Sequence, residues 1–479
     1  MLRSTAAVAA GGPFAGLVAA PASARRPPRA ARLVPVEDKR DGAVRLHLPR
    51  GFNYRSFHDT ETPVRLTDGT LLPGRHDGMG AFDGPRKSVL LVRNHEVNNP
   101  GPAFGPGDPY DAMAGGGTTT VQVDRHGRVM RSFTSLNGTM MNCSGGQMPW
   151  GAWVTCEETV NGPDVGADFT GVSNVPLTKP HGYVFEVPVS HQPGAGQSTR
   201  TPIRSAGRFA HEAVSFDPEG NHLYLTEDNF AFASGFYRYR PPSDAVRVGR
   251  LEDGGTLQML RVVGVDNAHL EAAQADGTTY DVEWVDIAEP DVEYDYVPGE
   301  AAPTPNDTAL THVASQGWEQ GAAYFSRLEG QKYDDGVVYF TSTQGGGAAE
   351  SGHHNSAGYG RGSGQVWAYD TRASTLTCVF NSPGPMTLDL PDNVTVSPRG
   401  TVVVCEDNVE DNFIRGLSAD GRIWDIALNR LRSSTGADRS GDEFAGSTFS
   451  PDGHTLFVNI QASRGMSFAI WGPWRSIGV

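Results

Sequence analysis

Acidic residues stand at the same place in several copies of a short repeat. Residues 215–228 recur as residues 394–407, and each copy reads as a strand, a Pro-x-Gly turn and a second strand that ends in an acid. If the copies are equivalent, Asp228 and Asp407 occupy matching strand ends, and Glu158 ends a weaker copy in the same way. Carboxylates that meet at the centre of a repeat protein repel one another unless cations neutralise them. The repeat therefore predicts a cluster of oxygen ligands for hard cations such as Ca²⁺.

The repeat also indicates the elements that must position these acids. Residues 448–458 are a third copy of the hairpin, residues 338–343 are a weaker one, and residues 90–96 are another that ends in Glu96. Most copies are followed by a loop, a glycine and a strand of alternating aromatic residues, as in residues 235–239. Short strands in repeated units favour a β-propeller, whose inner strands aim matching ends at one central channel. We predict an all-β, six-bladed propeller with inserted loops, with seven blades as the rival count.

The composition fits a turn-rich globular protein. The 479 residues include 59 Gly and 33 Pro, and 20% of them are charged, which excludes a coiled coil and a disordered chain. The net charge of −16 argues against nucleic acid or an anionic membrane surface as a partner. No run of about 18 apolar residues occurs, so no transmembrane segment is predicted. The 4 cysteines are too few for a disulfide framework in so long a chain.

The N-terminal segment has the pattern of an export signal. Residues 4–20 are small and apolar, and an Ala-x-Ala pattern ends at Ala24, so residues 1–24 are predicted to be a cleaved signal peptide. The first residues resemble the stretch that follows the paired arginines of a twin-arginine signal, so we expect translation to start upstream. The export machinery would then carry the folded protein to the periplasm, the cell surface or the medium.

We expect two further segments after the signal peptide. A linker and lead-in at residues 25–50 precede a propeller domain at residues 51–479, which contains an acidic insertion at about residues 251–310. Charge-rich insertions usually face water, and the alternative is a lid over the site.

Three other groups of residues could supply chemistry. Cys143 stands just before a pair of glycines with Glu158 close behind, and a thiolate near carboxylates suits a transition metal. Arg327 and Glu329 alternate on a predicted strand, so they share one face, where a guanidinium could grip two oxygens of a phosphate or carboxylate. Glu212 follows a histidine and could be a metal ligand or part of a general base. The structural alternatives are a buried thiol, a surface Arg–Glu pair and a salt bridge at a loop end.

Several of these motifs occur together in a known family. The most specific runs are residues 142–151 (Asn-Cys-Ser-Gly-Gly-Gln-Met-Pro-Trp-Gly), 155–158, 207–212, 327–330, 392–393, 405–408 and 443–446. With these runs the chain resembles the PhoX-type alkaline phosphatases, from about Gly51 to the C-terminal region. The resemblance implies a six-bladed propeller, twin-arginine export, and a central cofactor of Fe³⁺ and Ca²⁺ ions that hydrolyses small-molecule phosphate monoesters.

The resemblance also implies roles for individual residues. Cys143 resembles a thiolate that binds iron, and Arg327 resembles an arginine that binds the phosphate and acts in catalysis. The residues implied as further metal ligands are carboxylates and one amide: Glu96, Glu158, Glu212, Glu329, Asp392, Asn393, Glu406, Asp407 and Glu443. No catalytic Ser or Thr is assigned, because metal-ion catalysis with Arg327 beside the phosphoryl oxygens needs no side-chain nucleophile.

Two other functions stay open at this point. One is a metal-dependent propeller hydrolase for phosphodiesters or lactones, and the other is a non-catalytic, calcium-stabilised propeller that binds ligands at the channel mouth. The chain contains no Walker A motif, no G-x-S-x-G elbow and no H-E-x-x-H helix, which disfavours P-loop nucleotide hydrolysis, α/β-hydrolase chemistry and zincin proteolysis. The combination of motifs favours the phosphatase.

Overall fold

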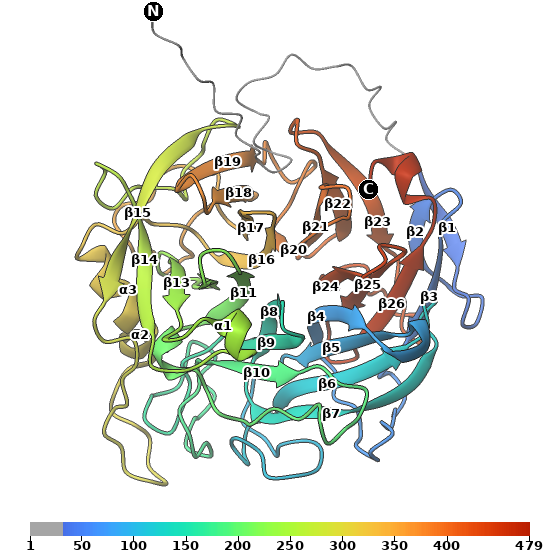
Figure 1. Ribbon diagram of the computed structural model, residues 1–479, viewed down its shortest axis with the longest axis horizontal. Helices are drawn as coiled ribbons and strands as arrows, with labels where there is room; N and C mark the ends of the chain where they lie inside the picture. Colours follow the sequence, from blue (N-terminus) through green and yellow to red (C-terminus); the bar gives the residue numbers. More distant parts are fainter. Residues whose placement is uncertain (1–31) are drawn as a thin grey trace, which may run out of the picture.

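The computed structural model describes residues 32–479, which form short antiparallel strands arranged around a central axis (Figure 1). This arrangement confirms the predicted all-β, propeller-type fold. The expected signal peptide, residues 1–24, lies outside the described residues. Among residues 32–479, no helix is long and apolar enough to cross a membrane.

The strands form antiparallel units, which we number 1 to 6 in the chain order of their innermost strands. Unit 1 contains β4 (His76–Asp83), β5 (Val89–His95), β6 (Gly116–Val123) and β7 (Val129–Thr139). Unit 2 contains β8 (Asn142–Met148), β9 (Ala152–Glu157) and β10 (Val184–Pro188). Unit 3 contains β11 (His211–Asp217), β12 (His222–Glu227), β13 (Phe236–Arg240), β14 (Thr256–Val262) and β15 (Thr279–Ile287).

The remaining units follow the same plan. Unit 4 contains β16 (Leu328–Asp334), β17 (Val337–Ser342), β18 (Gln365–Asp370) and β19 (Thr375–Asn381), and β19 pairs with β15 of unit 3. Unit 5 contains β20 (Pro391–Val396), β21 (Val402–Glu406), β22 (Phe413–Leu417) and β23 (Ile423–Asn429). Unit 6 contains β24 (Phe444–Phe449), β25 (Thr455–Ile460) and β26 (Met466–Trp471). Each innermost strand contacts the next, and β24 contacts β4, so these strands form a closed ring.

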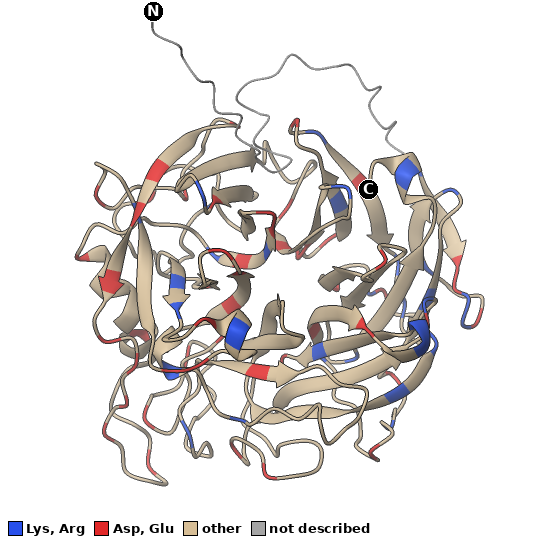
Figure 2. Cartoon of the chain, viewed as in Figure 1, with Lys and Arg blue, Asp and Glu red and all other residues tan. Residues whose placement is uncertain are grey.

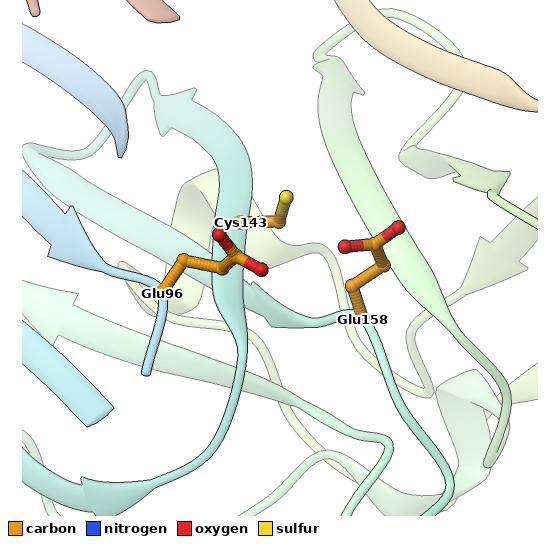
Figure 3. Close-up of side chains that lie close together, drawn as sticks. All are labelled: Glu96, Cys143 and Glu158. Carbon is orange, nitrogen blue, oxygen red and sulfur yellow. The ribbon is translucent and has the colours of Figure 1, made fainter. Parts of the chain in front are cut away.

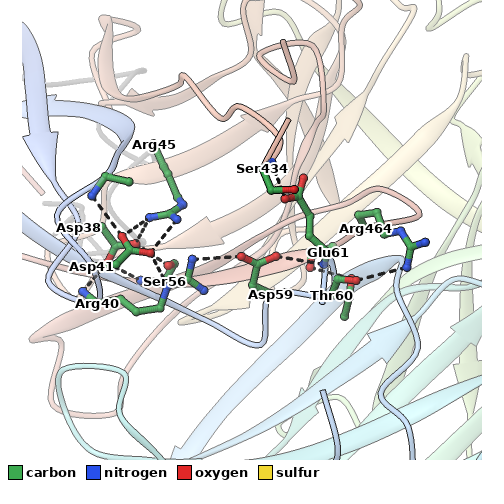
Figure 4. A network of polar contacts seen from close by, with 12 residues as sticks. Asp38, Arg40, Asp41, Arg45, Ser56, Asp59, Thr60, Glu61, Ser434 and Arg464 are labelled. Atoms are coloured by element: carbon green, nitrogen blue, oxygen red, sulfur yellow. Dashed lines mark hydrogen bonds and ion pairs between the residues drawn. The ribbon is translucent and has the colours of Figure 1, made fainter. Parts of the chain in front are cut away.

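The N-terminal strands join the end of the chain to its beginning. β1 (Leu33–Glu37) pairs with β2 (Val44–Pro49), β2 pairs with β23, and β3 (Asn53–Phe57) pairs with β26. Asp38 fixes this junction, because it accepts hydrogen bonds from the Arg45 guanidinium at 2.8 Å and the Ser56 amide at 3.1 Å (Figure 4). The segment at residues 33–49, expected as lead-in, is thus part of the sheets, and the boundary expected at residue 51 falls inside the domain.

The expected insertion at about residues 251–310 belongs largely to unit 3. It contributes β14 and β15, which a loop at residues 263–278 connects, and residues 288–305 form a second loop before the short helices α2 (Asn306–Leu310) and α3 (His312–Trp318). Asp291 anchors this acidic loop, because it accepts a hydrogen bond from the Tyr183 hydroxyl at 2.8 Å and pairs with Arg204 at 2.5 Å. The loop is therefore held beside the residues that flank β10. One further short helix, α1 (Ala245–Val248), follows β13.

Hydrophobic cores lie between neighbouring units. Val154 of unit 2 packs in one cluster with Val214 and Leu225 of unit 3, and Ile414 of unit 5 packs in another with Phe468 of unit 6. Full burial of one such side chain contributes roughly 1.5–3 kcal/mol. The alternation of buried residues along the strands therefore fixes how each unit sits against the next.

Every innermost strand begins with a β-bulge at the same point. Its first paired residue, or the second one in β24, is followed by two residues where the partner strand has one, as between His76 and Met79 or between Asn142 and Gly145. The same shift occurs in β11, β16, β20 and β24. A bulge re-aims a side chain that regular pairing would turn elsewhere. The first bulge residue of units 1 to 6 is, in order, Asp77, Cys143, Glu212, Glu329, Asp392 and Gly446.

The glycine in unit 6 should be required by space as well as by backbone conformation. A Cβ on Gly446 would lie 2.3 Å from the Asp77 carbonyl oxygen, and its φ is +62°. Gly436 has a φ of +87° and open space around it, so it provides a matched control. We expect Gly436→Ala to cost about 1 kcal/mol of unfolding free energy and Gly446→Ala about 2–4 kcal/mol, because crowding adds to backbone strain. Denaturant unfolding of both variants measures the difference, and equal costs would contradict the packing at this bulge.

Candidate metal centre

Possible metal ligands face the central axis at one end of the innermost strands. They fall into two groups, and the ligand atoms within each group lie within 4.8 Å of one another: Glu96, Cys143 and Glu158 in one (Figure 3), and Glu212, Glu329 and Asp392 in the other. Four of these residues are first bulge residues of units 2 to 5. The repeated bulge therefore brings together residues that lie far apart in the sequence.

A second row of side chains follows the ends of the second strands. In each of units 1 to 5, the residue just before the bulge pairs with a residue at the end of the second strand. The next residue along the chain is, in order of unit, Glu96, Glu158, Asp228, Thr343 and Asp407. This pairing places Glu158, Asp228 and Asp407 at equivalent positions, as the repeat predicts. Thr343 is the exception to the acidic pattern, and its hydroxyl donates to the Pro391 carbonyl at 2.7 Å.

The carboxylates are buried close enough to raise one another's pKa. Burial and the neighbouring Glu329 raise the pKa of Glu212 well above its ordinary value, and both Glu212 oxygens are buried without a hydrogen-bond partner. Burial and Asp228 raise the pKa of Glu158 in the same way. Burial and Asp407 raise the pKa of Asp392 to about 8. Buried anions of this kind favour a proton or a cation.

The thiol of Cys143 lies in the same negative environment. Burial, followed by Asp77 and Glu158, raises its pKa well above the ordinary value. A thiol with these neighbours becomes a thiolate only beside strong positive charge, and a transition metal supplies such charge. Thiolate and carboxylate together suit iron, whereas carboxylates alone suit calcium. The donor set therefore fits a mixed centre of the kind that the sequence implies.

Two arginines enter this acidic group from matching positions. Arg327 precedes β16 with a φ of +43°, and its guanidinium donates to Asp228 at 2.8 and 3.0 Å and pairs with Glu329 at 2.8 Å. Burial opposes its charge, but Asp228 and Glu329 hold its pKa well above the ordinary value. Arg75 precedes β4 with a φ of +50° and forms an ion pair with Glu96. Both guanidinium groups are therefore charged and held in place by acids of the centre.

Two further acids belong to the centre, and the sequence analysis missed the first of them. Asp77 is the first bulge residue of unit 1, accepts a hydrogen bond from Gln461 at 2.6 Å, and has its pKa raised by burial and by Glu96. Its hairpin lacks the Pro-x-Gly turn by which the other copies of the repeat are recognised. Only the pairing of His76 with His95 shows that this hairpin is equivalent to them. Glu443, which the resemblance implies, lies beside Asp407, and burial followed by Asp407 raises its pKa.

Two of the residues implied as ligands have other partners. Glu406 points away from the acids, because its oxygens accept from the Arg415 guanidinium at 2.9 Å and from the backbone amides of Asp389 and Phe413. Adjacent residues on a strand face opposite sides, so Glu406 and Asp407 do not both reach the centre. Asn393 is the second bulge residue of unit 5, and its amide donates to the Ser144 hydroxyl at 3.3 Å.

The remaining candidates from the sequence have structural positions. His211 donates a hydrogen bond from Nε2 to the Gly207 carbonyl oxygen at 2.9 Å and stacks near Phe209, and burial lowers its pKa to about 3. The three other cysteines are fully buried in hydrophobic clusters, as expected for packing residues: Cys156, Cys378 and Cys405.

A buried histidine supports the strand end beside Glu158. Glu157 accepts hydrogen bonds from His181 at 2.6 Å and from the Met140 and Gly182 amides at 2.9 Å. Burial opposes protonation of His181, but Glu157 and Asp111 outweigh it and raise its pKa to about 9. The Glu157 carboxylate therefore fixes the backbone on which Glu158 stands.

The metal-free protein should lose stability as the pH rises. The folded-state pKa of Asp392 is about 8 against an ordinary value of 3.8, so its contribution is fully present below about 4 and is lost as the pH rises through 8. Between pH 5 and pH 9 we expect a loss of roughly 3 kcal/mol or more in chelated protein, restored by Ca²⁺.

Thermal unfolding at both pH values, with chelator and with Ca²⁺, measures this loss. Asp392→Asn should reduce the pH dependence, whereas Glu300→Gln, at an exposed acid that forms no ion pair within residues 32–479, should leave it unchanged. Chelated protein that is equally stable at both pH values would contradict the expected repulsion.

Comparison with known proteins identifies the family of the chain. Residues 31–132 and 126–463 match the family model described as alkaline phosphatase PhoX. Among solved structures, PhoX from Pseudomonas fluorescens in complex with vanadate, a transition state analogue, is 18% identical, with 92% of this chain and 98% of that chain covered and a TM-score of 0.61. A gluconolactonase from Xanthomonas campestris is 13% identical, with 92% and 98% covered and a TM-score of 0.39. Comparison with curated proteins gives no match. Because the family model matches most of its length, the chain belongs to the PhoX family of alkaline phosphatases.

Proposed function

We propose that this protein is an exported, metal-dependent phosphatase that hydrolyses phosphate monoesters at a centre of Fe³⁺ and Ca²⁺ ions. The observation that carries the proposal is the buried group of carboxylates around Cys143, in which Glu212 has two oxygens without partners. Family membership supports the phosphatase activity. The vanadate bound to the Pseudomonas fluorescens protein, which has the same fold, supports chemistry at a phosphoryl group.

The ligand set that we propose follows the two rows of the site. Cys143 would bind iron, and Glu158 and Glu96 each have a carboxylate oxygen within 4.8 Å of its sulfur. The other proposed ligands are first bulge residues, acids that follow the second strands, and Glu443, which precedes β24: Asp77, Glu212, Asp228, Glu329, Asp392, Asp407 and Glu443. We leave Glu406 out of the set because Arg415 holds its carboxylate. When bound, the ions supply Lewis acidity for the phosphoryl oxygens.

Arg327 has the position to act on the substrate directly. Its Nε and Nη2 atoms are held by Asp228 and Glu329, and no described residue takes a hydrogen bond from its Nη1. Nη1 is thus free to donate to a phosphoryl oxygen, and the side chain is 20% exposed at the centre. A fixed guanidinium stabilises the charge on the equatorial oxygens during phosphoryl transfer. We assign no side-chain nucleophile.

Export is the proposed route to the site of action. Residues 1–24 carry the signal pattern and lie outside the described residues. The described part has no helix that could span a membrane. The fold and the proposed centre are consistent with a protein that folds around its ions before export.

The first experiment is metal analysis of the folded protein together with hydrolysis of a chromogenic phosphate monoester at alkaline pH. We expect tightly bound iron, and turnover that chelation abolishes and Ca²⁺ restores. A phosphodiester and a lactone serve as competing substrates, and faster turnover of either would replace the monoester assignment. Calcium without iron, and no turnover of any substrate, would favour a binding propeller instead.

Cys143→Ser should remove the iron and lower kcat by at least about 100-fold, since the ion provides the main electrostatic stabilisation. Cys378→Ser is the matched control, because Cys378 is buried in a hydrophobic cluster on β19, the outermost strand of unit 4, and it should keep both iron and turnover. Iron content and kcat are measured on the same preparations. Full iron binding by Cys143→Ser would remove the thiolate from the proposed ligand set.

Arg327→Lys should lower kcat by about 10²–10³-fold while leaving the metal content unchanged. A lysine ammonium group cannot bind both Asp228 and Glu329 and also donate to a phosphoryl oxygen in a fixed orientation. Arg415→Lys is the control, since Arg415 is a buried arginine that pairs with Glu406 outside the centre. We expect Arg415→Lys to lower the unfolding temperature with little change in kcat. Equal losses of kcat in both variants would show that Arg327 acts only through the fold.

A further inference from the structure

An arginine-lined pocket lies on the outer edge of the protein, away from the central acids. It has a volume of about 520 Å³ and lies where β3 of unit 6 meets the turn between β6 and β7 of unit 1. Its ionisable lining residues are Arg40, Arg55, His58, Asp59 and Arg128. In Figure 2, several Lys and Arg segments lie along this edge. A local group of arginines is unexpected in a chain with a net charge of −16.

The acids around the pocket do not balance its arginines. Arg40 uses the nearby carboxylates, since it pairs with Asp41 at 3.1 Å and with Asp59 at 3.0 Å. Arg55 and Arg128 form no ion pair with any carboxylate of residues 32–479, and the buried Nε of Arg55 has no hydrogen-bond partner. Two guanidinium groups therefore face this pocket with their charge uncompensated.

A third uncompensated arginine lies behind the pocket. Arg93 is fully buried and donates only to neutral groups, at 2.8 Å to the Ser467 hydroxyl and at 3.2 Å to Thr119 and to Nδ1 of His58. Its burial lowers its pKa to about 9, and burial followed by Arg93 holds the pKa of His58 well below the ordinary value. Because Nδ1 of neutral His58 accepts from Arg93, its proton is on Nε2, which is a hydrogen-bond donor.

The backbone segments that carry the two free arginines lie next to each other. Gly127 has a φ of +77°, and a Cβ there would lie 2.6 Å from the Ala469 Cβ and 3.5 Å from the Phe57 ring. The turn that carries Arg128 therefore packs directly on β26 and β3, and Arg55 is on β3 opposite Ala469. The two arginines therefore extend into the pocket from adjacent backbone segments.

We propose that this pocket binds a phosphate group, either as free phosphate or as part of a larger phosphorylated molecule. Guanidinium groups grip pairs of oxygens, and two of them with an imidazole donor can surround a tetrahedral oxyanion. The bound anion would neutralise Arg55 and Arg128 and weaken the field of the buried Arg93. The site is separate from the metal centre and does not depend on the proposed function.

The test is a count of bound phosphate by equilibrium dialysis of the full metal-loaded protein. The probes are labelled inorganic phosphate and phenylphosphonate, a monoester mimic that cannot be hydrolysed as an ester. We expect Arg55→Gln/Arg128→Gln to bind one fewer phosphate or phosphonate per chain than the parent protein. Since the pocket is remote from the acids, the hydrolysis of a chromogenic monoester should be unchanged in this variant.

Two further variants keep the result interpretable. Arg128→Gln alone, at an exposed side chain, should weaken the pocket about 3–10-fold without affecting the fold. Arg247→Gln makes the same charge change at an exposed arginine without an ion pair and should bind as the parent does. If the double variant binds one fewer molecule of either probe, the proposal is supported. Loss of inorganic phosphate indicates a site for free phosphate, and loss of phenylphosphonate indicates a site for a phosphate group of a larger molecule. Equal binding of both probes by the parent and the double variant would overturn it, whatever the metal centre binds.

Discussion

Several carboxylates share one buried place in this protein, and their mutual repulsion has to be balanced for the chain to stay folded. Two like charges about 4 Å apart repel by about 4 kcal/mol at an effective dielectric constant of 20. A few such pairs approach the whole stability of a typical domain, which is roughly 5–15 kcal/mol. Arg327 and Arg75 offset part of this repulsion through Asp228, Glu329 and Glu96. The unpartnered oxygens of Glu212 show that the protein's own cations do not offset all of it.

The repeated bulge explains how one fold can create this cluster and still vary it. Each innermost strand presents the same position to the axis, so the chemistry of the centre depends on which residue each unit carries there. Unit 2 carries the thiol of Cys143, and unit 6 carries Gly446, whose missing side chain makes room for the backbone at Asp77. The differences between units, rather than their similarity, therefore give the centre its mixed donor set.

The sequence allows prediction where the repeat is visible and fails where it is hidden. Glu158 and Asp407 are predictable because a strand with a recognisable pattern leads to each of them, whereas Asp77 follows a hairpin with a different turn. A motif does not show that Glu406 pairs with Arg415, because neighbouring strand residues face opposite sides and the partner lies on another strand. The pairing of residues 44–49 with β23 joins segments almost 400 residues apart, and no local pattern reveals such a contact.

Protons and cations compete for the same oxygens at this centre. With Asp392 at a pKa of about 8, the metal-free acids hold protons through most of the neutral range, and these protons relieve the repulsion. Above that range the protons leave, so cations have to provide the balancing charge. Cation affinity should then rise with pH for the same reason that the metal-free fold weakens. A centre built from crowded, buried carboxylates is therefore best suited to alkaline conditions, and this follows from its electrostatics before any substrate is considered.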